Sequence, residues 1–65
     1  MTIKLSRALS EDQGAKIIGV AVQTLRNWRH QRRGPAYYKI GRSVRYRLED
    51  LMKYLELKKI DPENQ

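Results

Sequence analysis

Residues 10–34, SEDQGAKIIGVAVQTLRNWRHQRRG, decide the fold, because they hold the signals for two helices joined by a tight turn. Ser10 and Gln13 have the spacing of a capping box, in which each side chain bonds the backbone amide of the other. The first helix is expected to run from there to about Ile18. Gly19 follows and is expected to end that helix in the left-handed conformation.

A second helix is predicted from Val22 to about Arg32. Its apolar residues Leu25 and Trp28 are three apart, and Arg32 is expected to share their inward face. The Gly34-Pro35 pair should end the segment, since glycine breaks a helix and proline cannot extend it.

The short glycine turn between these segments favours a helix-turn-helix. Ala15 lets the two helices approach closely, Gly19 supplies a positive φ, and the space behind them is filled by Ile18, Val20, Leu25 and Trp28. A generic helical hairpin can have the same pattern. The distribution of charge along the chain is an independent observation that distinguishes the two.

A β-hairpin is predicted next, because strand-forming residues flank the Gly41-Arg42 pair on both sides. A two-residue turn of type I′ or II′ fits this pair. Alternation predicts an inward face and a basic outward face, formed respectively by Tyr38, Ile40, Val44 and Tyr46, and by Lys39, Arg45 and Arg47. Of the aromatic side chains, four are assigned to the core: Trp28, Tyr38, Tyr46 and Tyr54.

A third helix is predicted from about Glu49 to Lys59. Its docking stripe comprises Leu51, Leu55 and Lys58, with Leu48 and Tyr54 nearby. The predicted fold is α+β and mostly helical: a winged helix-turn-helix with three helices and a two-stranded hairpin as the wing. Within 65 residues we expect one domain over 9–60, an N-terminal arm or short edge strand over 1–8, and a frayed polar tail over 61–65.

The charge distribution favours a polyanionic partner. The formal net charge is +7, and no acidic residue occurs between Gln13 and Leu48, a window that contains nine Lys or Arg residues. A solvated basic face is the plainer interpretation. A membrane surface would require the cations on one long amphipathic helix, whereas here they span a helix and a hairpin, so double-stranded DNA is preferred.

The outer face of the second helix provides side chains that can bind base edges. Arginine pairs with guanine, and glutamine or asparagine with adenine. Base contacts are predicted for Gln23, Arg26, Asn27 and His30, while Thr24 and Arg29 lie at the flanks and suit phosphates. Polar residues on the outer face of any helix are ordinary, which is the alternative for each of them.

The hairpin provides a second predicted contact, with a phosphate backbone or a narrow minor groove, through Lys39, Arg42 and Arg45. Arg42 lies at the tip, where a wing reaches furthest. The alternative is that these cations only protect an exposed strand edge from aggregation. Stacking of single-stranded bases on aromatic rings is disfavoured, because the pattern buries most of the rings.

Composition argues against several other classes. The chain has no cysteine and one histidine, so a zinc site is not expected, nor is any other metal or cofactor. An enzyme is not expected either, because the basic block holds no carboxylate and the single histidine lies on an exposed helix face. No apolar run approaches a membrane span and no signal-peptide pattern is present, so the expected location is a reducing cytoplasm.

The sequence resembles the excisionase/AlpA group of small winged helix-turn-helix proteins, related to the MerR DNA-binding domain. The resemblance rests on Gly19-Val20, Thr24-Leu25, Trp28-Arg29, Gly34-Pro35, Lys39-x-Gly41-Arg42, Val44-Arg45-Tyr46 and Asp50-Leu51, and it covers about residues 9–55. It implies a protein of a phage or integrative element, located in the cytoplasm of a bacterial host or associated with the nucleoid. The second helix would enter the major groove and the wing the neighbouring minor groove.

The resemblance also implies a function. An excisionase binds and bends attachment-site DNA beside an integrase of the tyrosine or serine type, with head-to-tail self-association on adjacent repeats; a small transcriptional regulator is the alternative. A protein-interaction module with an acidic partner is a third hypothesis. Two departures from the family pattern are Ala21, where a serine usually caps the second helix, and Gly14, where the first helix usually has alanine.

Overall fold

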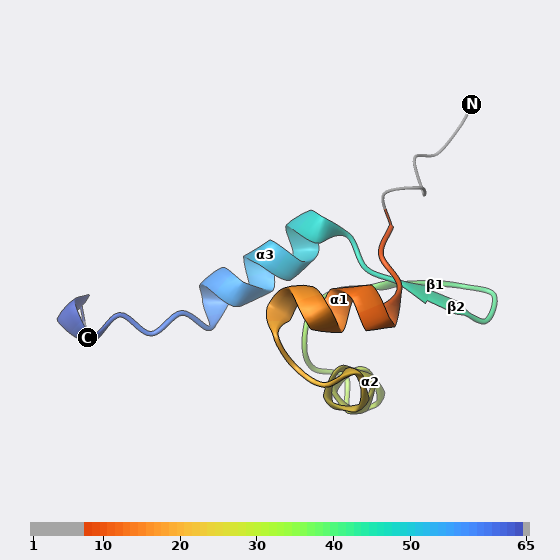
Figure 1. The fold of residues 1–65 in the computed structure, drawn as a ribbon, viewed down its shortest axis with the longest axis horizontal. Coiled ribbons are helices and arrows are strands. Elements are labelled where there is room, and N and C mark those ends of the chain that lie inside the picture. The colour runs from red at the N-terminus through yellow and green to blue at the C-terminus, as the bar shows by residue number, and fades with distance from the viewer. Residues whose placement is uncertain (1–7, 65) are drawn as a thin grey trace.

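The computed structural model describes residues 8–64. Its elements are α1 (Glu11–Ile18), α2 (Val22–His30), β1 (Tyr38–Ile40), β2 (Ser43–Arg45), α3 (Leu48–Leu57) and a short 3₁₀ turn, η2 (Pro62–Asn64) (Figure 1). Three helices and an antiparallel hairpin confirm the winged helix-turn-helix predicted from the sequence. The arm predicted for residues 1–8 lies, except for Ala8, outside the described residues.

Helix α1 begins and ends as its sequence predicts. The Ser10 hydroxyl accepts a hydrogen bond from the Gln13 amide at 3.1 Å, and the Gln13 side-chain oxygen accepts one from the Ser10 amide at 2.9 Å. Gly19 has a φ of 81° and closes the helix. The Val20 amide then donates to the Ala15 carbonyl, which turns the chain directly into α2.

Helix α2 ends at His30, two residues before the predicted end, and the expectation that Arg32 faces inward is wrong. Arg32 has a φ of 60° and an exposed side chain. Its amide donates to the Arg29 carbonyl, and the Arg33 amide donates to the Trp28 carbonyl at 2.8 Å. These two bonds form a Schellman motif, in which arginine occupies the left-handed position that glycine usually takes.

The hairpin has the predicted two-residue turn but a different face assignment. Only Gly41, with a φ of 61°, has positive φ in the turn, which is the type II′ pattern. Ile40 pairs with Ser43 across this turn, so even-numbered residues of β1 share a face with odd-numbered residues of β2. The two faces therefore comprise Tyr38, Ile40, Ser43 and Arg45 on one side, and Lys39 and Val44 on the other.

The predicted faces of the hairpin are corrected accordingly. Tyr38 and Ile40 do not share the inward face with Val44 and Tyr46, and both are exposed, at 43% and 47%. The guanidinium of Arg47 lies 5.5 Å from the centroid of the Tyr38 ring, on the outward side. Tyr37 contributes to the inward side instead, because its ring lies 6.0 Å from that of Tyr46.

The core is small and lies where α1 meets the other elements. Its fully packed members are Ala15, Leu25, Tyr46 and Leu51, surrounded by Leu9, Ile18, Val20, Val22, Trp28 and Val44. Helix α1 packs against both α2 and α3 and lies between them (Figure 1). Leu9 pairs with Tyr46 through two backbone hydrogen bonds of 2.7 and 2.8 Å, so the segment before α1 is fixed to the end of the hairpin.

Helix α3 docks through fewer of its residues than the predicted stripe contains. Leu51 is buried, and the Tyr54 ring packs 5.8 Å from that of Trp28. Leu48 is 51% exposed and Leu55 36% exposed, so neither contributes as predicted. Leu51 lies against Gly14 of α1 and Tyr54 lies against Trp28 of α2, and Leu48 and Leu55 are turned toward solvent.

Candidate nucleic-acid interface

The outward face of α2 carries the polar side chains predicted to bind DNA. Gln23, Asn27 and His30 are exposed, and the Arg26 side chain is 42% exposed. Leu25, on the opposite face, is fully buried, which fixes the rotation of the helix about its own axis. Thr24 is half-buried at the edge of the outward face.

A chain of side-chain contacts joins three of these residues to α1. The Glu11 carboxylate lies 3.5 Å from the Nε of Arg26. Arg26 Nη1 donates to the Oε1 of Gln23 at 3.0 Å, and Gln23 Nε2 donates to the Oδ1 of Asn27 at 3.0 Å. The outward face is therefore a connected polar network before any ligand binds.

Arg29 is held from within the fold. Its Nε donates to one oxygen of Glu11 at 2.8 Å and its Nη2 to the other at 3.2 Å, and its side chain is only 15% exposed. The guanidinium also lies 5.9 Å from the Tyr37 ring centroid. The structure thus brings Arg29 next to the proposed interface but directs two of its nitrogens inward.

Glu11 is the centre of this arrangement. Its Oε2 also accepts a hydrogen bond from the Tyr46 hydroxyl at 3.2 Å. The Arg29 hydrogen bond holds the pKa of the Glu11 carboxyl below its usual value, and the same bond raises the pKa of Arg29. Burial, followed by the charge of Glu11, raises the pKa of Tyr46 to about 12.

Sequence reasoning missed Glu11 as part of the site. An acidic residue in the first turn of a helix interacts favourably with the helix dipole whatever else it contacts, so its position in α1 does not indicate a further role. Its partners Arg29 and Tyr46 are 18 and 35 residues away, and no local pattern shows such pairs. The sequence offers one signal for such a role. The basic block contains no acidic residue, so a carboxylate that neutralises one of its arginines has to come from outside the block, as Glu11 does.

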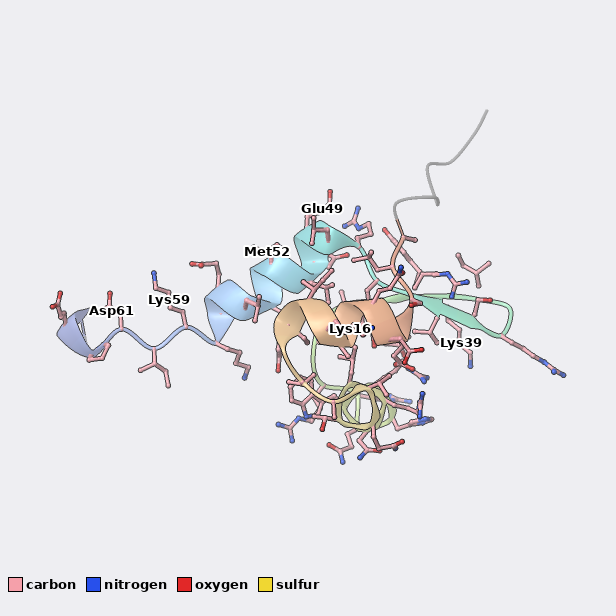
Figure 2. All side chains as sticks on the ribbon, viewed as in Figure 1. Lys16, Lys39, Glu49, Met52, Lys59 and Asp61 are labelled. Carbon is pink, nitrogen blue, oxygen red and sulfur yellow. The ribbon has the colours of Figure 1, made fainter. Side chains whose placement is uncertain are left out.

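The wing separates its three predicted contact residues. Arg42 is exposed at the tip, and Lys39 is exposed on the face that also carries Val44. In Figure 2, the Lys39 side chain extends to the side of the hairpin on which α2 lies. Arg45 is on the opposite face, half-buried, and its Nη1 donates to the Val44 carbonyl at 2.9 Å.

The interface thus combines an exposed polar helix face, a tight turn before it and a basic hairpin after it. A family model described as "Helix-turn-helix domain" matches residues 8–58. The chain belongs to this helix-turn-helix family. The family is of the AlpA/excisionase type, so the resemblance seen in the sequence is confirmed at this level and the chain is a small DNA-binding domain. A search of curated proteins finds no relative that matches the chain.

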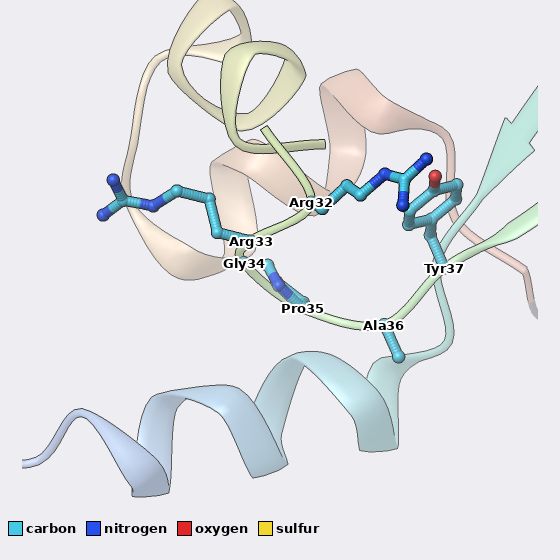
Figure 3. A pocket seen from close by; sticks show the side chains of 6 residues that line it. All are labelled: Arg32, Arg33, Gly34, Pro35, Ala36 and Tyr37. Atoms are coloured by element: carbon cyan, nitrogen blue, oxygen red, sulfur yellow. The ribbon is translucent and has the colours of Figure 1, made fainter. Parts of the chain in front are cut away.

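Within this helix-turn-helix domain, the segment between α2 and the wing forms a shallow surface pocket. It is lined by Arg32, Arg33, Gly34, Pro35, Ala36 and Tyr37. Figure 3 shows the Arg32 side chain extending toward the Tyr37 end of the pocket, while Arg33 extends in the opposite direction. The pocket therefore adds positive charge between the two predicted DNA-contacting elements.

Over residues 8–64, no group of three or more acidic, histidine or cysteine side chains is placed to hold a metal ion. None of the helices in that range is both long and apolar enough to cross a membrane.

Proposed function

We propose that this helix-turn-helix domain is an excisionase, a recombination directionality factor that binds and bends attachment-site DNA beside an integrase of the tyrosine or serine type. The supporting observation is the outward face of α2, which is polar, preorganised and followed by a basic wing. The AlpA/excisionase-type family match supports the recombination role. The proposal assigns no enzymatic step to this chain, and the relation to MerR proteins stays an expectation.

In this proposal α2 lies in the major groove. Gln23, Arg26, Asn27 and His30 contact base edges, and Thr24 contacts a phosphate. Glu11 binds the Nε and Nη2 of Arg29, so a phosphate would bind at the remaining nitrogen, Nη1.

The wing anchors the domain to the neighbouring backbone or minor groove. Arg42 at the tip and Lys39 on the α2 side make the principal contacts, and Arg45 supports the outer side of the hairpin. Such contacts add affinity for any sequence, whereas the contacts from α2 provide the discrimination.

The size of the domain requires several copies for useful occupancy. A single module of this kind buries about 600–1,000 Å² of protein surface on DNA. Head-to-tail association on direct repeats would raise the effective concentration of each copy beside the next and add up the bends.

Footprinting on DNA from the protein's own genetic neighbourhood tests the proposal. Protection of spaced direct repeats beside an integrase attachment site is the expected result. Protection of a promoter alone would replace excision with the alternative role, a small transcriptional regulator of a phage or integrative element. Loss of all DNA retardation under excess nonspecific competitor would overturn both and favour an acidic protein partner.

The contribution of the wing has a test of its own. Arg42→Ala should weaken binding to all sequences and reduce the slope of log affinity against log salt by about one. Lys59→Ala is the charge-matched control, because Lys59 lies beyond α3, at the end of the molecule away from the hairpin (Figure 2). An unchanged slope for Arg42→Ala would remove the wing contact from the proposal.

A further inference from the structure

The polar network on α2 has a fixed hydrogen-bond direction. Glu11 is ionised and only accepts hydrogen bonds, and arginine only donates them. The group of Gln23 that faces Arg26 must therefore be its carbonyl oxygen, and its amide nitrogen must face Asn27. The group of Asn27 that meets this nitrogen must in turn be its oxygen.

The direction of the network determines what the surface offers to a ligand. The carbonyl oxygens of Gln23 and Asn27 each already accept a hydrogen bond within the helix. Both N–H groups of the Asn27 amide remain available, as do one N–H of Gln23 and the Nη2 group of Arg26. The face is consequently rich in donors, although two amides are present that in isolation would offer donors and acceptors equally.

Base pairs differ in how well they match such a donor-rich face. In the major groove guanine presents two acceptors, N7 and O6, and thymine presents one, O4. Adenine presents an acceptor beside a donor, and cytosine presents only a donor. A donor facing the amino group of cytosine would leave both groups without an acceptor.

We propose that Glu11, acting through Arg26, sets the amide orientation of Gln23 and Asn27 so that α2 selects guanines on one strand, excludes cytosine at the same positions and disfavours adenine. This inference rests on the proposed DNA contact of α2. Glu11 is a positioning residue in it, and Gln23, Arg26 and Asn27 determine specificity. The usual pairing of glutamine and asparagine with adenine is disfavoured, because the amide oxygen that it needs already accepts one hydrogen bond and is directed at a neighbouring side chain of the network.

Selection from a pool of duplexes with a randomised central segment tests the inference. The enriched motif should contain adjacent guanines on one strand. Replacing each of these with 7-deazaguanine, which removes the N7 acceptor and keeps base pairing, should weaken binding about 5- to 10-fold at the positions under α2. A motif in which those positions are adenine or cytosine would overturn the guanine preference and leave sequence-specific binding intact. Failure to enrich any motif would overturn the proposed function as well.

A variant that reverses the network tests the role of orientation. In Gln23→Glu the new carboxylate still accepts from Arg26 but cannot donate to Asn27. The Asn27 amide should then rotate, donate to the carboxylate and present its oxygen outward. The base preferred opposite Asn27 should change from guanine to adenine or cytosine, by about 10-fold in relative affinity.

The negative charge added in Gln23→Glu should weaken binding to every duplex equally. The preference is therefore measured as the ratio of affinities for duplexes that differ at one base pair, in which this common loss cancels. Position 23 is exposed, so the variant should keep the wild-type circular dichroism spectrum and melting temperature. Gln31→Ala, at the exposed C-terminal cap of the same helix, is the matched control and should keep the wild-type motif. An unchanged preference in Gln23→Glu would show that the network does not set the orientation.

Discussion

Gly14→Ala should stabilise this domain, even though residue 14 is buried. Gly14 lies inside α1 and is not among the glycines with positive φ, so alanine fits the backbone. A Cβ added there would lie 3.5 Å from Tyr46 Cδ1, 3.6 Å from Leu51 Cδ1 and 3.7 Å from Leu25 Cδ2, all ordinary van der Waals distances. The new methyl group would fill space in the core without displacing a neighbour.

Two terms contribute to the expected gain. Glycine inside a helix costs about 1 kcal/mol relative to alanine, mainly through backbone entropy. Burial of one further methyl group contributes about 0.8 kcal/mol. Together they predict an increase of about 1–2 kcal/mol in the free energy of unfolding, which for a domain of this size is a rise of about 4–16 °C in Tm.

Urea unfolding and thermal melting followed by circular dichroism measure this change, and two other glycines are matched controls. Gly19→Ala forces alanine to a φ of 81° but meets no atom within 4 Å, so it should lose only about 1 kcal/mol. Gly34→Ala combines a φ of 90° with contacts of 3.1 and 3.2 Å to Trp28, so its loss should be larger. A Gly14→Ala variant no more stable than wild type, or Gly19→Ala less stable than Gly34→Ala, would refute the reasoning.

Three further outcomes follow from the N-terminal cap of α2 and from the Glu11 cluster, which comprises Glu11, Arg26, Arg29 and Tyr46. Ala21→Ser should add about 1 kcal/mol in a melting experiment, because Ala21 caps α2 in an extended conformation with no side-chain bond; no gain would show that the α2 amides are satisfied otherwise. In a spectrophotometric titration, one tyrosine should ionise near pH 12 and this late step should be absent in Tyr46→Phe. Persistence of the late step in Tyr46→Phe would assign it to another tyrosine. Since Tyr46 ionises near its ordinary pKa of 10.0 in the unfolded chain, the folded state should lose stability as pH rises above 10. Because the folded-state pKa of Glu11 is lowered, its contribution should be present above pH 4.5 and disappear as pH falls through the folded value. Glu11→Gln should therefore reduce the acid dependence of stability, and equal dependence in both proteins would contradict the role of the ion pair.

Local signals in the sequence predicted most of the fold. The capping box at Ser10 and Gln13 and the terminator Gly19 act within a few residues, so their geometry follows from chemistry that the sequence displays directly. The two-residue turn at Gly41 and Arg42 was equally local. The faces of the hairpin were nevertheless assigned wrongly, because alternation within each strand does not give the register between strands. A two-residue turn at Gly41 and Arg42 pairs Ile40 with Ser43, and this pairing assigns the side chains to the correct faces.

The end of α2 depends on packing that its sequence does not display. Arg32 adopts a left-handed φ although arginine has no preference for it. The Arg33 amide donates to the Trp28 carbonyl, and Gly34 lies so close to the Trp28 side chain that a Cβ added there would be 3.1 Å from Trp28 Cβ. Trp28 also packs against Tyr54 of α3. The residues that end α2 therefore pack on a side chain that also contacts a distant element, and no local pattern in the sequence shows that contact.

The Glu11 cluster links the core of the domain to the surface proposed to bind DNA. A carboxylate beside a basic face would repel phosphates if it were unpaired. Here Arg29 binds both of its oxygens, Arg26 lies 3.5 Å away, and the hydroxyl of the buried Tyr46 donates to it from the hairpin side. The charge is thus neutralised locally, while α1, α2 and the end of the hairpin are fixed relative to one another. The core of this domain is small, so apolar packing alone fixes its elements less firmly than in a larger protein. The hydrogen bonds of the Glu11 carboxylate fix α1, α2 and the end of the hairpin instead. The same carboxylate contacts Arg26, through which we propose that it orients the outward side chains of α2.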